Sequence, residues 1–201
     1  MGNLRSVSKA IEHVAPTKNV LVTSDAELIH NAERVVFPGQ GAMPDCMREL
    51  DARMLRAAIV DAAKTKPFLG ICIGMQLLFE RSEEGDTPGL GLFQGNVVRF
   101  AEKRVDENGE KLKVPHMGWN RVYQTNPHAL WAGIDEGERF YHVHSYYASP
   151  QDAALTAGQS EYPKRFTTAV ARDNIFATQF HVEKSAAAGL QLLRNFVNWK
   201  P

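Results

Sequence analysis

Apolar residues recur at two different spacings along the first half of the chain, and each spacing predicts a type of element. Leu4, Val7, Ile11 and Val14 are spaced as on one face of a helix. Short, continuous apolar runs predict buried strands, and longer amphipathic segments predict helices. The expected strands are residues 19–24, 34–37 and 67–71, and the further expected helices are residues 26–32, 45–65 and 73–80. This alternation predicts βαβ units in a mostly parallel sheet.

The second half has a different pattern, in which short strands follow one another. Residues 95–123 contain two expected strands around Asn108-Gly109, a dipeptide typical of hairpin turns. Further strands are expected at residues 139–149, 154–162, 166–171 and 175–180, and an amphipathic helix at residues 185–199. We therefore expect one α/β domain over residues 1–201. Its sheet would be flavodoxin-like, open and mostly parallel, with helices on both faces and antiparallel strands added in the C-terminal half.

Composition limits the kinds of partner and compartment. The 201 residues include 23 basic and 23 acidic residues, so net charge gives no reason to expect nucleic acid or an anionic membrane as partner. Two cysteines are too few for a secreted disulfide framework. No apolar run reaches the roughly 18 to 20 residues of a membrane span, and the first ten residues lack a signal-peptide core. We expect a cytoplasmic protein with reduced thiols, no metal and no cofactor, since no Cys/His spacing matches a zinc site.

The pattern Gly-x-Cys-x-Gly at residues 70–74 suggests chemistry for Cys72. This cysteine follows an expected strand and precedes an expected helix, as in the thiol counterpart of a serine nucleophile elbow. A helix N-terminus there would favour the thiolate and offer backbone N–H groups to an oxyanion. A free cysteine is also often a buried apolar side chain. Cys72 alone leaves both interpretations open, whereas Cys46, inside an expected helix, is interpreted as structural.

A base and its orienting group follow the last expected strand. His181 and Glu183 are two residues apart, so their side chains would share one face if the strand extends through them. A carboxylate there can hold the imidazole in the tautomer that a base requires. The turns at 38–41, 70–74 and 179–185 all flank expected strands, so they are expected to meet at one sheet edge. Together these features predict Cys-His-Glu catalysis.

At this point the motifs resemble a known family. "GICIGMQ" at 70–76 and "FHVEKS" at 180–185 are similar to the class I, triad-type glutamine amidotransferases. "MGNLRSV" at 1–7, "FPGQGAM" at 37–43, "VPHMGWN" at 114–120 and "HVHSYY" at 142–147 resemble one branch, the glutaminase subunits of imidazole glycerol phosphate synthase. The elbow motif fits many amidotransferases, whereas "GNLRSV" with "HMGWN" is more specific to this branch.

The resemblance implies that the chain hydrolyses glutamine through a Cys72 thioester, with His181 moving the proton and Glu183 orienting His181. The oxyanion would accept hydrogen bonds from the N–H of Ile73 and from that of Gln40 or Gly41. The substrate-binding residues implied by the family are Gly39, Gln76, Glu84, His144, Ser145 and Tyr146. From the residues alone, Glu84 is equally a solvated charge, and residues 142–147 are equally a plain strand.

The resemblance also implies a heterodimer with a (β/α)₈ barrel cyclase subunit, which uses the ammonia to make imidazole glycerol phosphate and AICAR in histidine biosynthesis. Trp119, Asn120 and Lys184 match family positions near that interface, although Trp119 could also be an ordinary core residue. Family members usually begin with a short apolar strand that this sequence, starting at Met1-Gly2, does not show. We expect lower stability than for a chain in which that strand is restored.

Two alternatives remain at the level of sequence. A related glutaminase could serve another synthase, such as that of pyridoxal phosphate, although "HMGWN" and "GNLRSV" argue against it. A non-catalytic assembly subunit could share the fold, although the presence of Cys72, His181 and Glu183 argues against that.

Overall fold

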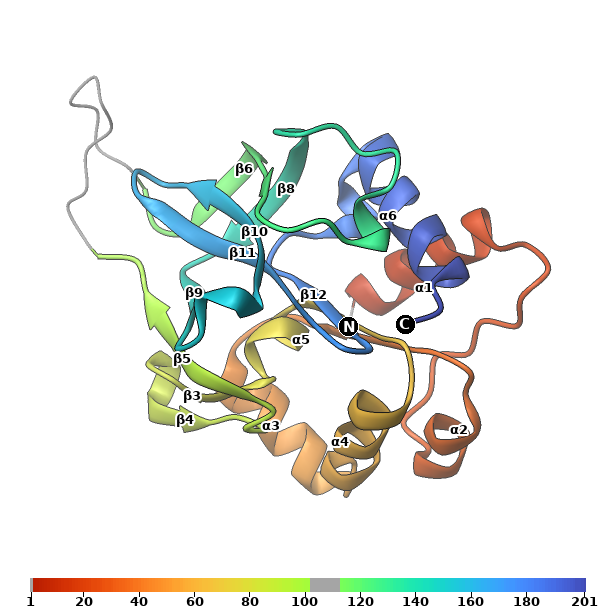
Figure 1. Ribbon diagram of the computed structural model, residues 1–201. Coiled ribbons are helices and arrows are strands. Elements are labelled where there is room, and N and C mark those ends of the chain that lie inside the picture. The colour runs from red at the N-terminus through yellow and green to blue at the C-terminus, as the bar shows by residue number, and fades with distance from the viewer. Residues whose placement is uncertain (1, 102–112) are drawn as a thin grey trace.

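The computed structural model describes residues 2–101 and 113–201 (Figure 1). The α-helices are α1 Gly2–Val14, α2 Ala26–Asn31, α3 Met43–Ala52, α4 Arg56–Thr65, α5 Ile73–Gln76 and α6 Ala186–Asn198. The strands are β1 Val35–Gly39, β2 Phe68–Cys72, β3 Phe79–Ser82, β4 Thr87–Pro88, β5 Phe93–Arg99, β6 His116–Arg121, β7 Tyr123–Gln124, β8 Arg139–His144, β9 Tyr146–Pro150, β10 Thr156–Glu161, β11 Arg165–Arg172 and β12 Ile175–Thr178. Four 3₁₀ turns complete the described chain: η1 Glu84–Asp86, η2 Ala129–Trp131, η3 Ala153–Leu155 and η4 Val182–Lys184.

The main sheet runs in the order β1-β2-β12-β11-β9-β5-β3-β4, with β10 and β7 attached beside β11. Strands β1, β2 and β12 are parallel neighbours, and β3 is parallel to β5. Antiparallel pairing joins β12 to β11, β11 to β9 and β9 to β5. A separate two-stranded sheet pairs β6 with β8. The expected α/β class, with antiparallel strands added in the C-terminal half, is confirmed.

Helices cover both faces of the parallel part of the sheet. In Figure 1, α1 and α6 pack together over one face, and α3 and α4 lie against the other. Strand β2 is buried along its whole length, as its continuous apolar run predicted. Phenylalanines form much of the core on either side of it, including the fully buried Phe68, Phe79, Phe140, Phe176 and Phe180. This rigid centre holds the carboxyl ends of β1, β2 and β12 in register.

The expected strand at residues 19–24 is not formed. That segment has no regular secondary structure, and Leu21 and Val22 are 60% and 58% exposed. β-branched residues favour a strand only where a neighbour supplies hydrogen bonds and a packing surface. Within the described chain β1 pairs with β2 alone, which leaves the other edge of β1 open, but residues 19–24 do not pair with that edge.

Two expected helices are shorter than the sequence pattern indicated. The expected helix 45–65 divides into α3 and α4, because Met54 has a φ of +55°, which a continuing helix cannot contain. The expected helix 73–80 ends after Gln76, and residues 79–82 form β3 instead. The apolar run of residues 77–79 was ambiguous, because a buried strand and a buried helix both have continuous apolar residues.

The expected hairpin around Asn108-Gly109 is only half right. Strands β5 and β6 do lie on either side of that dipeptide, which itself falls outside the described residues. They do not pair with each other, since β5 pairs with β3 and β9 whereas β6 pairs with β8. The Asn-Gly dipeptide predicts a turn only locally. The partner of each strand was decided by packing in the rest of the fold.

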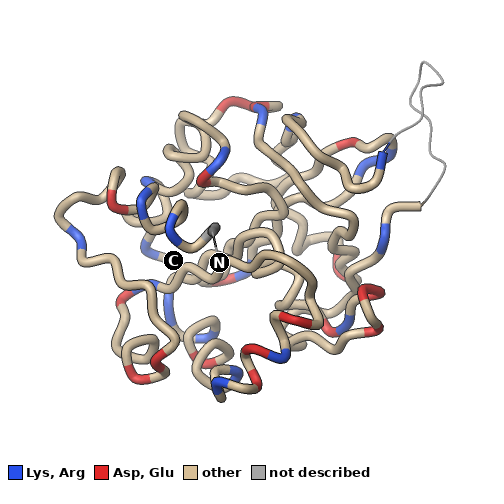
Figure 2. Tube along the Cα trace, turned by 180° about the vertical axis from the view of Figure 1, so that it is seen from behind, with Lys and Arg blue, Asp and Glu red and all other residues tan. Residues whose placement is uncertain are grey.

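Charged residues of both signs are interspersed over the trace (Figure 2). This distribution agrees with the balanced composition. Within the described ranges, no helix is long and apolar enough to cross a membrane.

Candidate active site

Cys72 stands on a sharp turn between β2 and α5. Its backbone has a φ of +57° and a ψ of −113°, which is rare for a residue with a side chain. Such a conformation costs on the order of 1–3 kcal/mol and persists only where the surroundings enforce it. The side chain is 5% exposed and lines a cavity. The expected strand–nucleophile–helix geometry is therefore present.

The two flanking glycines are required by close backbone approaches. A Cβ on Gly74 would lie 1.8 Å from the Phe37 carbonyl oxygen, which leaves no room for any side chain. A Cβ on Gly70 would lie 2.9 Å from the Cβ of Ala177 on the neighbouring strand. Gly74 thus lets α5 pack directly on β1, and Gly70 lets β2 and β12 lie beside it.

The helix after Cys72 spans only four residues, so its dipole contributes less than the expected longer helix would. The free backbone N–H groups at the start of α5 are the other contribution, since the first N–H groups of a helix have no acceptor within it. The N–H of Ile73 belongs to this first turn. Ile73 lines the same cavity as Cys72, which makes its N–H a candidate donor there.

His181 and Glu183 lie in a turn and not on a strand, because β12 ends at Thr178 and η4 begins at Val182. The His181 N–H donates to the Tyr141 carbonyl at 2.9 Å, and the Ser185 hydroxyl donates to the His181 carbonyl at 2.6 Å. These bonds fix the turn against β8. The two side chains meet as expected, with His181 Nδ1 2.9 Å from Glu183 Oε1.

The surroundings of His181 favour its charged form. Burial alone would lower the pKa of His181, but hydrogen bonds with Cys72 and Glu183 outweigh burial and raise this pKa to about 9. The Glu183 side chain is fully buried, and its Oε2 has no hydrogen-bond partner in the described part of the chain. The carboxylate therefore acts on His181, whose charged ring also forms a hydrogen bond with Cys72.

A cavity of about 290 Å³ joins the three turns that the sequence predicted to be neighbours. Parallel pairing aligns Gly39 with Cys72, and Thr178 with Ile71, so the turns after β1, β2 and β12 share one edge. The lining residues are Gln40, Gly41, Cys72, Ile73, Gln76, Glu84, Pro115, Val143, His144, Ser145, Tyr146, His181 and Lys184. Gly39, Trp119, Asn120 and Glu183 do not line it. Eleven of the fifteen expected site residues are thus brought together at one cavity, ten of them expected to be catalytic or substrate-binding and the eleventh, Lys184, expected at the interface.

The turn after β1 approaches the elbow closely. A Cβ on Gly39 would lie 2.7 Å from the Ile73 Cβ, so glycine is needed for this approach. Gly41 has a φ of +89°, a conformation that favours glycine. The Cys46 thiol, half-buried on α3, donates to the Gln40 carbonyl at 3.5 Å. Cys46 therefore has a structural contact at the turn, in keeping with its expected structural role.

Two polar side chains that line the cavity are anchored by hydrogen bonds. The Glu84 carboxylate accepts a hydrogen bond from the Met43 N–H at 2.8 Å, at the first residue of α3. Gln76 Nε2 donates to the Tyr146 carbonyl at 3.1 Å and to Gln179 Oε1 at 3.0 Å. The buried Oε1 of Gln76 has no partner among the described residues. Both side chains are thus held in fixed positions at the cavity.

Gln179 is the polar residue that the sequence analysis missed. Its side chain is fully buried, and its Nε2 lies 3.8 Å from the Cys72 Sγ. The signal was a single amide side chain in the otherwise apolar segment 175–180. Pro115 and Val143, which complete the cavity wall, carry no such signal.

The residues expected near a partner lie at the rim. Trp119 is 49% exposed and Met117 beside it is 62% exposed, so Trp119 is not a core residue. The Trp119 ring contacts the edge of Tyr141, and Lys184 Nζ lies 5.8 Å from the centre of the Tyr141 ring. An exposed apolar patch thus adjoins Lys184, which also lines the cavity.

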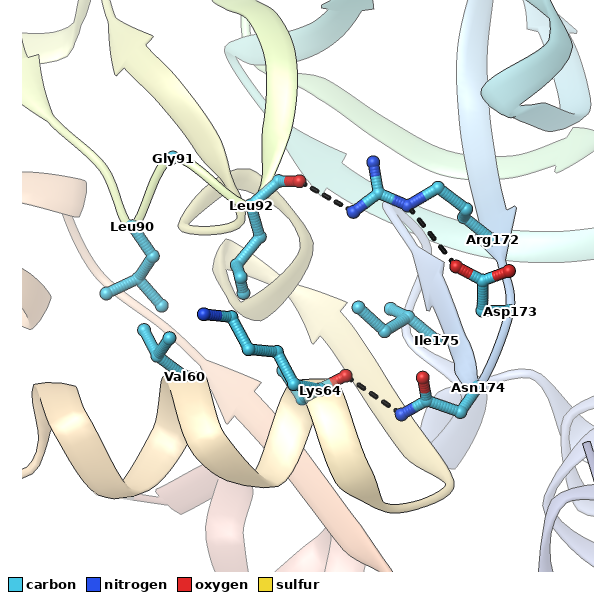
Figure 3. Close-up of a pocket in the computed structure, with 10 residues that line it drawn as sticks. Val60, Lys64, Leu90, Gly91, Leu92, Arg172, Asp173, Asn174 and Ile175 are labelled. Atoms are coloured by element: carbon cyan, nitrogen blue, oxygen red, sulfur yellow. Dashed lines mark hydrogen bonds and ion pairs between the residues drawn. The ribbon is translucent and has the colours of Figure 1, made fainter.

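A larger cavity of about 360 Å³ lies elsewhere, between α4, the β11–β12 turn and residues 90–92 (Figure 3). Its polar groups are occupied in holding chain segments together. Arg172 donates to the Leu92 carbonyl at 2.8 Å and lies 3.8 Å from Asp173, and Asn174 donates to the Ala63 carbonyl at 2.8 Å. None of the residues predicted to be catalytic lines this space. The smaller cavity is therefore the candidate active site.

Comparison with known proteins agrees with this geometry. Residues 2–199 match the family described as glutamine amidotransferase class-I. The chain is 65% identical to the imidazole glycerol phosphate synthase subunit HisH of Aromatoleum aromaticum, over all of this chain and 95% of that one. It is 66% identical to the HisH of Dechloromonas aromatica, over all of this chain and 94% of that one.

Solved structures support the same fold. A glutamine amidotransferase structure is similar with a TM-score of 0.71 and 14% identity, over 98% of this chain and 93% of that one. The glutaminase domain of Trypanosoma brucei CTPS with bound acivicin is similar with a TM-score of 0.63 and 17% identity, over 98% and 89% of the two chains. With the family match and full-length relatives in agreement, the chain belongs to the class I glutamine amidotransferases and, within them, to the HisH subunits of imidazole glycerol phosphate synthase.

Proposed function

We propose that the chain hydrolyses glutamine through a covalent Cys72 thioester and delivers the ammonia to a cyclase subunit. The observation that carries this proposal is the meeting of Cys72, His181 and Glu183 at one cavity, with the His181 pKa raised to about 9. Nucleophilic catalysis by cysteine needs a thiolate, a proton donor for the leaving group and a group that orients the donor. These three residues supply them in that order.

In the first step the Cys72 thiolate attacks the side-chain amide carbon of glutamine. The charged His181 gives its proton to the departing nitrogen, the C–N bond breaks, and ammonia leaves the thioester. In the second step water adds to the thioester carbon while His181 takes one of its protons. The C–S bond then breaks, glutamate leaves with its carboxyl proton lost to solvent, and the thiolate and imidazolium are restored.

Both steps pass through a tetrahedral oxyanion. The Ile73 N–H and a second N–H from Gln40 or Gly41 are proposed to stabilise it, since all three residues line the cavity beside Cys72. Removing one such donor typically costs about 3–4 kcal/mol in the barrier. Gly39 has a supporting role, because its missing side chain allows the turn to approach Ile73.

The remaining lining residues are proposed to hold the substrate. Glu84 would pair with the α-ammonium group of glutamine, and Gln76, which lines the same cavity, would contact the substrate. His144, Ser145 and Tyr146 form the opposite wall. Glu84, Ser145 and Tyr146 are only partly buried, so their polar groups are accessible to a ligand in the cavity.

The partner is proposed to be a (β/α)₈ barrel cyclase that uses the ammonia to make imidazole glycerol phosphate and AICAR, as a heterodimer in the cytoplasm. The exposed Met117 and Trp119, with Asn120 and Lys184 nearby, would form the interface around the cavity mouth. Exposed aromatic residues are frequent anchors of interfaces. A cytoplasmic location fits because a catalytic Cys72 must stay reduced.

The proposal is tested by glutamine turnover with and without the purified cyclase, comparing the unaltered chain with Cys72→Ala. We expect the cyclase to increase ammonia release and Cys72→Ala to abolish it, with a covalent γ-glutamyl adduct (glutamine less ammonia) on the unaltered chain after acid quenching. Turnover by Cys72→Ala would refute the mechanism. Turnover that did not respond to the cyclase would refute the partner.

A further inference from the structure

A continuous chain of hydrogen bonds connects β6 to the candidate active site. Asn120 Nδ2 lies 3.2 Å from His116 Nε2, and His116 Nδ1 lies 3.0 Å from His144 Nε2. His144 Nδ1 in turn lies 2.8 Å from the Tyr146 carbonyl oxygen. The register of the small sheet places His116 directly opposite His144, which is why the two rings meet.

The donor and the acceptor of every hydrogen bond in this series follow from the groups at its two ends. The Arg121 N–H donates to Asn120 Oδ1 at 2.8 Å, so the other side-chain atom of Asn120 is the amide nitrogen, a donor. His116 Nε2 must therefore accept, which leaves the proton on His116 Nδ1. His144 Nε2 must then accept from His116, which leaves the proton on His144 Nδ1, facing a carbonyl that can only accept. All bonds are satisfied in one arrangement alone, with both imidazoles neutral and protonated at Nδ1.

Burial supports the neutral state of both rings. His116 is 4% exposed and His144 is 6% exposed. Burial lowers the pKa of His116 to about 4 and the pKa of His144 to about 3. The Tyr162 ring, with its centre 4.1 Å from that of His116, covers one face of the first imidazole. The arrangement is thus enclosed on the side away from the cavity.

The inner end of this hydrogen-bond series is the Tyr146 carbonyl, which belongs to the proposed glutamine pocket. The Tyr146 carbonyl that accepts from His144 also accepts from Gln76 Nε2, and the second N–H of that amide donates to Gln179. Gln179 Nε2 contacts the Cys72 Sγ. The amide plane of Gln76, and so the direction of its free Oε1, therefore depends on where His144 holds the Tyr146 carbonyl.

The outer end lies on the strand that carries the exposed apolar patch. Successive side chains of a strand point to opposite faces, so Met117 and Trp119 point outward while His116 and Asn120 point inward. Asn120 Nδ2 also donates to the Glu161 carbonyl of β10 at 2.9 Å, which ties β6 to the rest of the fold. Asn120 thus has an internal role besides its expected place near the interface.

We infer that Asn120 and His116 are positioning residues: they hold His144 in its Nδ1-protonated tautomer and, through the Tyr146 carbonyl, fix Gln76 in the glutamine pocket. The consequence for substrate rests on the proposed glutaminase function, whereas the tautomer assignment does not. Neither residue touches the reacting atoms. Their effect is expected on the affinity for glutamine, since Gln76 binds substrate and does not take part in bond breaking.

The first test is ¹⁵N NMR of the full chain labelled at histidine, because the two ring nitrogens of a neutral histidine differ strongly in shift when only one is protonated. We expect His116 and His144 to be neutral and protonated at Nδ1 between pH 6 and pH 8. A proton on Nε2 of His144 in the unaltered chain would overturn the inference without any variant, and without reference to activity.

The second test compares His116→Asn with His116→Leu. Asparagine places an amide N–H near the position of Nδ1 and keeps the donor to His144, whereas leucine fills similar space with no donor. We expect His116→Leu to admit the Nε2-protonated form of His144 and to raise the KM for glutamine about tenfold with little change in kcat, as for one lost hydrogen bond. His116→Asn should restore both the shifts and the KM.

A matched control is His142→Gln. His142 is also buried in β8, but it forms hydrogen bonds with the Phe140 carbonyl and Thr168 and is not part of the hydrogen-bond series that connects Asn120 to Tyr146. The His142 ring packs against both His116 and His144, but we expect this variant to leave the Nδ1-protonated tautomer of His144 and the KM unchanged. Equal KM values for His116→Asn and His116→Leu, or unchanged His144 shifts in His116→Leu, would overturn the inference. Absence of glutamine hydrolysis in the unaltered chain with its cyclase would instead refute the proposed function, while the NMR result would still decide the tautomers.

Discussion

The imidazole of His181 and the carboxylate of Glu183 lie 2.9 Å apart, and both side chains are almost completely buried. The contact is made by Nδ1, which leaves Nε2 as the ring nitrogen for exchange with Cys72 or substrate. A carboxylate in this place does two things, because it fixes the ring orientation and favours the charged ring. The pH dependence of the reaction follows from the second effect.

We predict that kcat/KM declines above about pH 9, where His181 loses the proton that ammonia departure requires, since its pKa is raised to about 9. Glu183→Gln removes one of the contacts that raise this pKa, so the alkaline limb should move to lower pH. We also expect kcat to fall by about 10²- to 10⁴-fold, as for loss of the orienting carboxylate in other triads. The measurement is a pH–rate profile of both proteins with the cyclase present. An alkaline limb at the same pH in both would contradict the role of Glu183.

The same shift makes a prediction for stability. A group with a raised pKa in the folded state stabilises it fully below the unfolded pKa of about 6.5, and this contribution is lost as pH rises through the folded value of about 9. The difference in free energy of unfolding between the unaltered chain and His181→Gln should therefore shrink between pH 6.5 and pH 9. Guanidinium titrations at several pH values measure it, and a difference that grew with pH would contradict the assignment.

Gly74 provides a prediction about the elbow itself. Because a Cβ there would lie 1.8 Å from the Phe37 carbonyl oxygen, Gly74→Ala must push α5 away from β1. We expect a loss of about 3 kcal/mol or more in the free energy of unfolding. Gly91→Ala is the matched control: Gly91 has a φ of +66° but open space around it, so only the backbone cost of about 1–2 kcal/mol applies. Equal losses in the two variants would show that the close approach is unimportant.

These examples show how far local sequence determined the site. The elbow glycines could be recognised because their spacing from Cys72 reflects a local backbone requirement. The adjacency of His181 and Glu183 was also predicted, although a turn and not a strand produces it. Gln179 and His116 were missed because their roles depend on partners about 30 to 100 residues away in sequence, which only strand register brings close. The strand expected at 19–24 was wrong for a related reason, since strand propensity is local whereas pairing depends on where a segment lies relative to the sheet, and this segment pairs with no strand.

Glu84 allows substrate binding to be separated from folding. Its carboxylate holds the Met43 N–H and also lines the cavity. Glu84→Gln keeps an oxygen acceptor for Met43 but removes the charge, so stability should change little while the KM for glutamine rises about 10- to 100-fold. Inhibition by a glutamine analogue without its α-ammonium group should be the same for both proteins. A KM unaffected by the substitution would show that Glu84 does not bind the ammonium.

The exposed patch around Trp119 makes the prediction about the partner. Trp119→Ala should weaken binding of the cyclase by about 2 kcal/mol or more, because a large aromatic side chain at the centre of an interface is a frequent hot spot. Trp119 is half-exposed in the chain alone, so its own thermal midpoint should move little. Met54→Ala is the control, since Met54 is 85% exposed at the α3–α4 turn, away from the cavity mouth. Calorimetric titration of each variant with the cyclase measures the affinities. If Met54→Ala and Trp119→Ala weakened binding equally, the surface around Trp119 would not be the interface.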